Sequence, residues 1–234
     1  MIEKQSLIIF FCSSLFSVAD LARNIIFGIK GFKYPIIVLD KEKGFQHTVA
    51  EINLYVDLPA KFKGTHMSRF IEVINEFKGE IHIKNVMELL RRLKKRLSAR
   101  SAHIEMYFPY FLEKKAPVSG ISSLMEYQAF IIASYFHRKK DIIAGIEVPV
   151  MTLCPCSKLI SKYSAHNQRG KVTIKVRFKK FIWLEELIEI AETSASSPLY
   201  SLLKRPDEKF VTCLLYTSDA ADEGLGVDLG GRRI

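Results

Sequence analysis

The strongest constraint on the fold of this chain is the order in which strand-like and helix-like apolar patterns follow one another. Two strand patterns come first, "YPIIVLD" (residues 34–40) and "QHTVAEINLYVDL" (residues 46–58), with the turn-forming "KEKG" between them. Apolar residues then recur at helical spacing in "SRFIEVINEF" (residues 68–77) and "NVMELLRRLKKRL" (residues 85–97). This order predicts a strand pair followed by a helix pair.

A similar order returns in the second half of the chain. "WLEELIEIAE" (residues 183–192) is a helical pattern, and Pro198 can open a further helix because proline is favoured in a first helical turn. Long strands with inserted helix pairs, present twice, predict an α+β fold of two similar halves built on an antiparallel sheet. The further strand patterns cover residues 102–114, 127–139, 141–153 and 171–180.

Two strand patterns alternate clearly enough to predict which side chains face the core. In residues 46–58 the alternation has one break, which indicates a bulge, and in residues 171–180 apolar residues alternate with charged ones. The predicted inward positions are Val49, Ile52, Leu54 and Val56 in the earlier strand and Val172, Ile174, Val176 and Phe178 in the later one.

The balance of charge indicates an anionic partner. The 234 residues carry a formal net charge of +10, which suits nucleic acid, a membrane surface or a phosphorylated small molecule, or else a solvated basic surface. Much of the charge lies in "LLRRLKKRLSAR" (residues 89–100), where leucines recur at helical spacing. This run is therefore predicted to be the exposed face of an amphipathic helix.

The residue types best suited to metal binding or catalysis lie in "TLCPCSKLISKYSAHNQRG" (residues 152–170). In this stretch Cys154 and Cys156 precede His166 by twelve and ten residues. Thiolate and imidazole are both ligands for zinc and its neighbours. Three protein ligands would make a catalytic site with one open position, and a fourth from elsewhere would make a structural one. A redox pair is less favoured because the spacing is C-x-C, and a chance grouping without metal is the remaining reading.

Three long motifs in the same order resemble the GTP cyclohydrolase type IB family. They are "FGIKGFKYPIIVLDKEKGFQHTVAEINLYVDLPAKFKGTHMSRFIEVIN", the cysteine stretch quoted above, and "SLLKRPDEKFVT". The resemblance covers residues 28–212 and implies the tunnelling fold (T-fold), in which two tandem ββαα-type modules form an antiparallel sheet. It also implies a homo-oligomer, with a homotetramer favoured, and active sites at subunit interfaces.

The resemblance implies hydrolysis of GTP at C8 of guanine, which releases formate and gives 7,8-dihydroneopterin triphosphate, the first step of folate biosynthesis. It implies a divalent metal (Zn²⁺, Mn²⁺ or Fe²⁺) held by Cys154, His166 and Glu208, with Cys156 beside it assisting proton transfer. The three ligands leave one position open for water, as a metal-dependent hydrolase requires.

The substrate of the family gives the basic residues a use. Lys158 and Arg169, together with Lys204 or Arg205, are candidates to neutralise the triphosphate of GTP. His66 and Arg69 are further substrate-binding candidates, for the site of a neighbouring subunit. GTP is a cytosolic compound, so a cytoplasmic protein without nucleic-acid or membrane partners is expected.

The two ends of the chain depart from the family pattern. Residues 1–27 include an apolar run typical of a signal peptide, and we interpret them as a divergent or artefactual segment. Residues 213–234 lose periodicity and are interpreted as a non-native read-through tail, which would leave the second module truncated. Glu223 has the spacing of the family's guanine-anchoring glutamate but lies in that tail, so it is not assigned the role; Ser164 replaces a family glycine.

Two alternative functions remain open from the sequence. An archaeal-type relative of the same fold would make a cyclic phosphate product. A basic nucleic-acid-binding module with a structural zinc would need four protein ligands and aromatic residues among the basic ones. The run at residues 89–100 has no aromatic residue, which counts against the second alternative.

Overall fold

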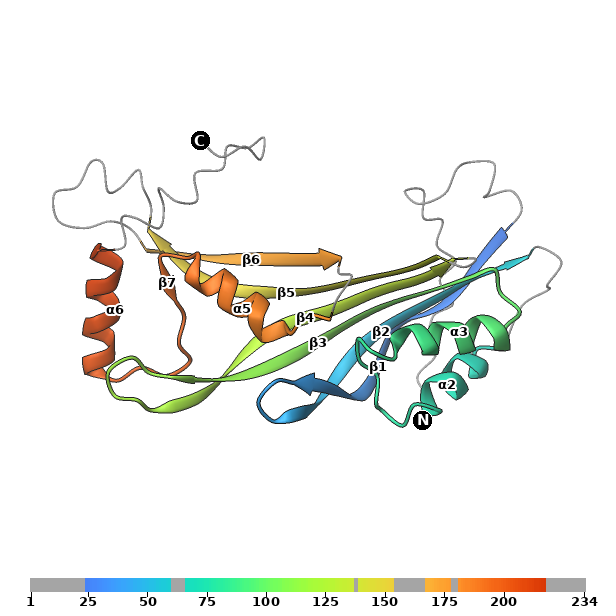
Figure 1. Ribbon diagram of the computed structural model, residues 1–234, viewed down its shortest axis with the longest axis horizontal. Coiled ribbons are helices and arrows are strands. Elements are labelled where there is room, and N and C mark those ends of the chain that lie inside the picture. The colour runs from blue at the N-terminus through green and yellow to red at the C-terminus, as the bar shows by residue number, and fades with distance from the viewer. Residues whose placement is uncertain (1–23, 60–65, 137–138, 154–166, 178–180, 218–234) are drawn as a thin grey trace, which may run out of the picture. The chain divides into compact units, whose positions relative to one another are not determined.

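The computed structural model describes residues 24–59, 66–136, 139–153, 167–177 and 181–217. Its strands form one sheet in the order β1-β2-β3-β4-β5-β6, with β7 paired to β5 (Figure 1). The pairs β1–β2, β2–β3 and β5–β7 are antiparallel, so the predicted α+β class with an antiparallel sheet is confirmed. The strands are β1 (Asn24–Asp40), β2 (Gly44–Pro59), β3 (Ser101–Lys115), β4 (Ser122–Phe136), β5 (Lys139–Leu153), β6 (Asn167–Arg177) and β7 (Ser197–Pro198).

The chain divides into two compact units, each made of segments from both halves of the sequence. The first unit contains β1 and β2 with α2 (Ser68–Asn75) and α3 (Val86–Arg96), and the second contains α5 (Leu184–Thr193), β7 and α6 (Arg205–Thr217). Long strands such as β3 contribute residues to both. Within the part of the chain that the structure describes, none of the helices has the length and apolar character needed to span a membrane.

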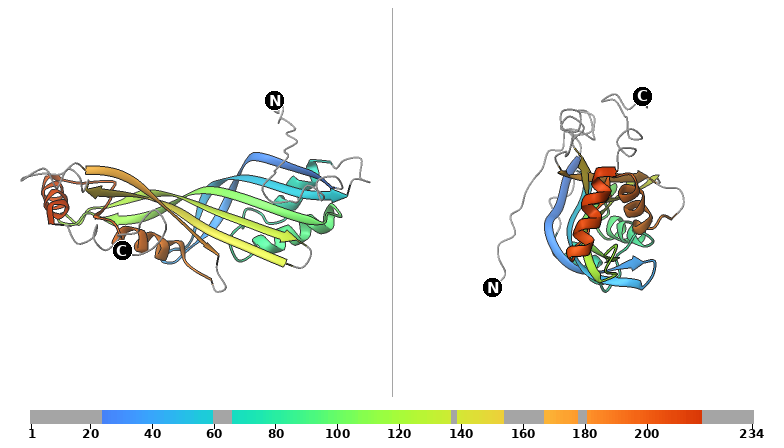
Figure 2. Two further views of the ribbon diagram at one scale, coloured as in Figure 1. Left: turned by 90° about the horizontal axis from the view of Figure 1, so that it is seen from above. Right: turned by 90° about the vertical axis from the view of Figure 1, so that its left-hand side faces the viewer.

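The core of the first unit lies between its strands and its helix pair (Figure 2). Helix α2 buries Phe70 and Ile74, and the predicted apolar face of α3 is fully buried through the leucines at 89, 90 and 93. This burial confirms the prediction of an amphipathic helix with its charges in water.

The prediction that Val49 faces inward is wrong, because 53% of this residue is exposed. In strand β2 the even-numbered residues 48–58 are all buried, and the polar residues Asn53 and Asp57 are buried on the other face. A β-branched residue suits either face of a strand, so composition alone misassigned the register. The irregularity lies in β1, between Ile29 and Phe32, where Gly31 takes a φ of 68° and donates its N–H to Asn53 Oδ1 at 2.8 Å.

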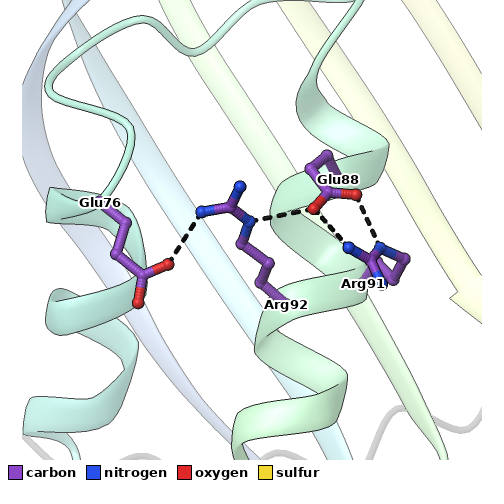
Figure 3. A network of polar contacts seen from close by, with 4 residues as sticks. All are labelled: Glu76, Glu88, Arg91 and Arg92. Atoms are coloured by element: carbon purple, nitrogen blue, oxygen red, sulfur yellow. Dashed lines mark hydrogen bonds and ion pairs between the residues drawn. The ribbon is translucent and has the colours of Figure 1, made fainter.

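The charges of α3 are organised into ion pairs on the helix surface (Figure 3). Arg91 Nε and Nη2 each donate to Glu88 at 2.7 Å, and Arg92 Nε donates to Glu88 at 3.0 Å while its Nη1 reaches Glu76 at 3.1 Å. Hydrogen bonds from Arg91 and Arg92 lower the pKa of Glu88 to about 2. Part of the basic excess of the chain is therefore balanced locally.

Replacing Glu88 with glutamine is expected to lower the free energy of unfolding by less than about 1 kcal/mol, because all partners are largely exposed. The depressed pKa means that the contribution is full above pH 4.5 and is lost as the pH falls towards 2. Urea unfolding of Glu88→Gln and wild type at neutral and acidic pH measures this. The exposed Glu189 of α5 offers a matched control, and a difference that persists in 1 M salt would contradict the argument.

The core of the second unit is covered by α5. Helix α5 buries Leu184, Leu187 and Ile188 against one face of its strands (Figure 2). Val172 of β6 is 36% exposed rather than inward as predicted, because β6 is an edge strand whose apolar face is only partly covered; Phe178 lies outside the described residues.

Pro198 does not open a helix, contrary to the prediction. It pairs with Val150 in the short strand β7, which pairs only with β5 in the described sheet, and such an edge position tolerates proline; the helix starts at Arg205. At the ends of the described chain, β1 begins at Asn24 and α6 ends at Thr217, so both elements cross the expected limits at residues 28 and 212.

Candidate functional site

The predicted site residues fall partly outside the described residues. Cys154, Cys156, Lys158 and His166 all lie within residues 154–166, of which the structure describes nothing. The remaining predicted residues are exposed: Glu208 in the first turn of α6, Arg169 on β6, and His66 and Arg69 at the start of α2 in the first unit.

The strands on either side of the cysteine segment in the sequence, β5 and β6, are both described. Cys154 follows the last residue of β5 and His166 precedes the first residue of β6, and these two strands are neighbours in the sheet. A Cβ built on Gly170 would lie 3.6 Å from Val150 Cγ2, so the start of β6 lies against the end of β5. The end of β5 and the start of β6 therefore lie side by side in the sheet.

Helix α6 lies at that same strand end (Figure 1). Its Val211, which is 8% exposed, packs against Met151 of β5 together with Tyr200 and Leu203. Met151 precedes Cys154 by three residues, and Val211 follows Glu208 by three residues. The fold thus brings the helix that carries Glu208 next to the strand end that leads into the cysteine segment.

Asp207, which the sequence reading did not single out, is a buried carboxylate at the start of α6. Its Oδ1 accepts the N–H groups of Val118 (2.9 Å) and Ser119 (2.8 Å), and its Oδ2 accepts Ser119 Oγ and the N–H of Lys204, both at 2.8 Å. Burial by itself raises the pKa of Asp207, but the donors on Ser119, Lys204 and Val118 outweigh it and hold the pKa below its usual range. The sequence signal that could have identified Asp207 is an acidic residue at the third position of a helix. Its carboxylate can accept a hydrogen bond from the backbone N–H of the capping residue.

A second, partly buried polar cluster contacts the segment that leads into α6. Lys114 Nζ donates to Glu192 Oε1 (2.7 Å) and to the carbonyl of Leu199 (2.8 Å), and it lies 4.9 Å from the ring centre of Tyr200. The hydroxyl of Tyr127 donates to the same Glu192 oxygen at 2.7 Å. Burial and this hydrogen bond raise the pKa of Tyr127, so it remains a neutral donor.

The donor set of thiolate, imidazole and carboxylate is one that zinc and neighbouring divalent metals accept. Within the described ranges, no group of three or more histidine, cysteine, aspartate or glutamate side chains is placed to hold a metal. Asp207 is not available as a ligand, since its two oxygens already accept four hydrogen bonds. Glu208, the next residue, is exposed and fits the third place in the set.

The fold places the chain in the α+β class with an antiparallel sheet. The model of the family described as "Type I GTP cyclohydrolase folE2" matches residues 25–219. "GTP cyclohydrolase FolE2" of Syntrophus aciditrophicus is 60% identical over 185 residues, which is 79% of this chain and 72% of the relative. The protein of the same name from Geotalea uraniireducens is 58% identical (79% and 68% covered), and that from Thermosipho africanus is 54% identical (86% and 78% covered).

Among solved structures, uricase from Arthrobacter globiformis aligns with a TM-score of 0.48 and 8% identity, over 85% of this chain and 78% of that one. A similarity at this level carries no conclusion about function or fold family. The family model, in contrast, matches residues 25–219, and the relatives named above are 54% to 60% identical. The chain belongs to the type I GTP cyclohydrolase FolE2 family.

Proposed function

We propose that this protein is a metal-dependent GTP cyclohydrolase that hydrolyses GTP at C8 of guanine to formate and 7,8-dihydroneopterin triphosphate, in folate biosynthesis. The family membership supports the reaction. The observation that carries the proposal is the contact of Val211 with Met151, because it holds the helix of Glu208 beside the strand end that leads into Cys154.

Cys154, His166 and Glu208 are the proposed ligands of a divalent metal, which can be Zn²⁺, Mn²⁺ or Fe²⁺. When bound, such a metal lowers the pKa of a coordinated water towards neutrality and supplies a nucleophile at neutral pH. Cys156, two residues from Cys154, is proposed to hold or move a proton beside the reacting carbon. The buried hydrogen bonds of Asp207 keep that carboxylate out of the reaction and leave Glu208 facing solvent.

The triphosphate needs cations, and the exposed basic residues of the second unit can supply them. Arg169 at the start of β6 and Lys204 and Arg205 at the start of α6 flank the proposed site in sequence, and Lys158 lies within the cysteine segment. The start of α6 also presents a positive dipole end. His66 and Arg69 belong to the first unit and are proposed to serve the site of a neighbouring subunit in a homo-oligomer, with a homotetramer favoured.

Other properties implied by the family are proposed here as well. They are the T-fold with two tandem modules, a cytoplasmic location, and the division of the chain into residues 1–27, 28–212 and 213–234. Re-sequencing the 3′ end of the gene tests the last of these directly. A 3′ end that encodes the same residues 213–234 would contradict a non-native tail.

Purified full chain given GTP and Mn²⁺ or Zn²⁺ is expected to release one formate per GTP and a product that becomes a fluorescent pterin on oxidation. Mass spectrometry separates the triphosphate from a cyclic phosphate, the product of the archaeal-type alternative. Chelation should stop formate release and added metal should restore it. Tight, salt-sensitive binding of nucleic acid without any formate release would favour the basic binding module instead.

A further inference from the structure

The carboxylate of Asp207 joins two segments that are distant in the sequence. Its Oδ2 accepts the N–H of Lys204, which is the usual hydrogen bond from a third-position acid to the start of its own helix. The other three hydrogen bonds come from Val118 and Ser119 in the turn between β3 and β4, 89 and 88 residues away. Helix capping needs only the first of these, so the other three serve to attach α6 to the turn (Figure 1).

The turn that receives Asp207 is itself well defined. Ala116 donates its N–H to the carbonyl of Ile121 at 2.9 Å, Gly120 donates to the carbonyl of Ala116 at 3.1 Å, and Gly120 takes a φ of 68°. A glycine in this left-handed region closes the turn without strain. The backbone of the turn therefore holds the N–H groups of Val118 and Ser119 in place. Their hydrogen bonds to Asp207 fix the position of the first turn of α6.

A second attachment point lies one helical turn further along. Asp207 and Val211 are four residues apart and so share one face of α6, and both are buried. Two fixed points on one face determine both the position and the rotation of the helix. Glu208 follows Asp207 by one residue, about 100° around the helix axis, and is exposed.

From this geometry we infer that Asp207 is the positioning residue for the Glu208 carboxylate. It acts by anchoring the first turn of α6 to the β3–β4 turn, and it does not touch the metal or the substrate. The inference rests on the proposed function, in which Glu208 is a metal ligand. Residues that orient metal ligands typically contribute about 10- to 100-fold in metal affinity, and Asp207 is expected to do the same.

The test is a titration of the metal-free full chain with Co²⁺, which reports ligand geometry through its d–d and thiolate charge-transfer absorption. Asp207→Asn replaces an acceptor oxygen with an NH₂ donor that faces N–H groups, and it should weaken Co²⁺ binding by about 10- to 100-fold and shift the d–d bands. Ser119→Ala removes one of the four hydrogen bonds and should weaken binding in the same direction by a smaller factor.

Asp40 provides the matched control. It is a buried aspartate of the first unit that also accepts two backbone N–H groups, from Glu42 (2.9 Å) and Lys43 (2.7 Å), together with Gln46 Nε2 (3.1 Å). Asp40→Asn removes the same chemistry from a turn remote in sequence from the proposed ligands. It should leave the Co²⁺ affinity and spectrum unchanged.

The outcomes separate this inference from the proposed function. Wild-type Co²⁺ affinity and spectrum in Asp207→Asn, with binding lost in Glu208→Gln and Cys154→Ser, would overturn the positioning role alone. Equal losses in Asp207→Asn and Asp40→Asn would also overturn it, since the effect would then be general destabilisation. Wild-type binding in Glu208→Gln and Cys154→Ser would refute the metal assignment itself. If Asp207→Asn does not fold, Ser119→Ala still decides, because an unchanged Co²⁺ affinity there contradicts the inference.

Discussion

Alanine in place of Cys154, His166 or Glu208 is expected to reduce formate release from GTP by more than about 100-fold, the upper range for groups that merely orient a ligand. If these three residues are the ligands, as proposed, each variant keeps only two of them, and two protein ligands would hold a divalent metal weakly. The Glu208 effect follows from the position of α6, which Val211 holds beside the end of β5. Formate release and the metal content of the purified variants should fall together.

Controls for these three variants come from the same chain. Cys12→Ala removes a thiol from residues 1–27, and Glu189→Gln removes an exposed helical carboxylate from α5. Both should keep the metal content and rate of wild type. A Glu208→Ala protein that releases formate at the full rate and retains its metal would show that another residue supplies the third ligand.

Replacing Glu192 with alanine is expected to lower the free energy of unfolding by about 1 to 3 kcal/mol, above the range of exposed ion pairs and below that of fully buried ones, because this pair is partly buried. Lys114 and Glu192 are only 11% and 15% exposed, so the lysine would lose its carboxylate in a site that water reaches poorly. Tyr127, which is buried, would lose its acceptor as well. Chemical denaturation of Glu192→Ala and wild type measures the difference.

A double variant distinguishes pairing from simple loss of packing. Lys114→Met with Glu192→Leu replaces both charges by apolar side chains and should recover much of the lost stability, whereas each single variant should not. A loss below about 1 kcal/mol in Glu192→Ala, the range expected for the exposed Glu88 pairs, would contradict the argument from burial. The larger loss of stability expected for Glu192 than for Glu88 follows from the lower exposure of the Lys114–Glu192 pair.

The amphipathic pattern was sufficient to predict α3 and the core it covers. Val86, Leu89, Leu90 and Leu93 are buried as the 3.6-residue period requires, and the charged residues between them pair in water. Period alone was not sufficient for β2, because Val49 is as apolar as its inward neighbours. Only the pairing of β2 with β1 and β3 decides which face meets the helices.

Local propensity also gave the wrong answer at Pro198, and for an instructive reason. Proline suits both a first helical turn and an edge position in a strand, so the residue itself does not choose. The pairing with Val150 chooses the strand. Likewise, the acid of "KRPDE" that is buried is Asp207, and its partners lie 88 and 89 residues earlier, beyond the reach of any local pattern.

By itself the sequence determined the α+β class, the order of elements as far as α5, the family and the residue types at the proposed site, because these depend on periodicity and on contiguous motifs. Tertiary structure alone decided which of two adjacent acids is buried and which faces solvent. Asp207 fills its four acceptor positions with donors from the β3–β4 turn and from Lys204, which leaves Glu208 exposed on the adjoining surface of α6. Long-range hydrogen bonds and packing, such as Val211 on Met151, are the physical reason, since they exist only once the strands have paired.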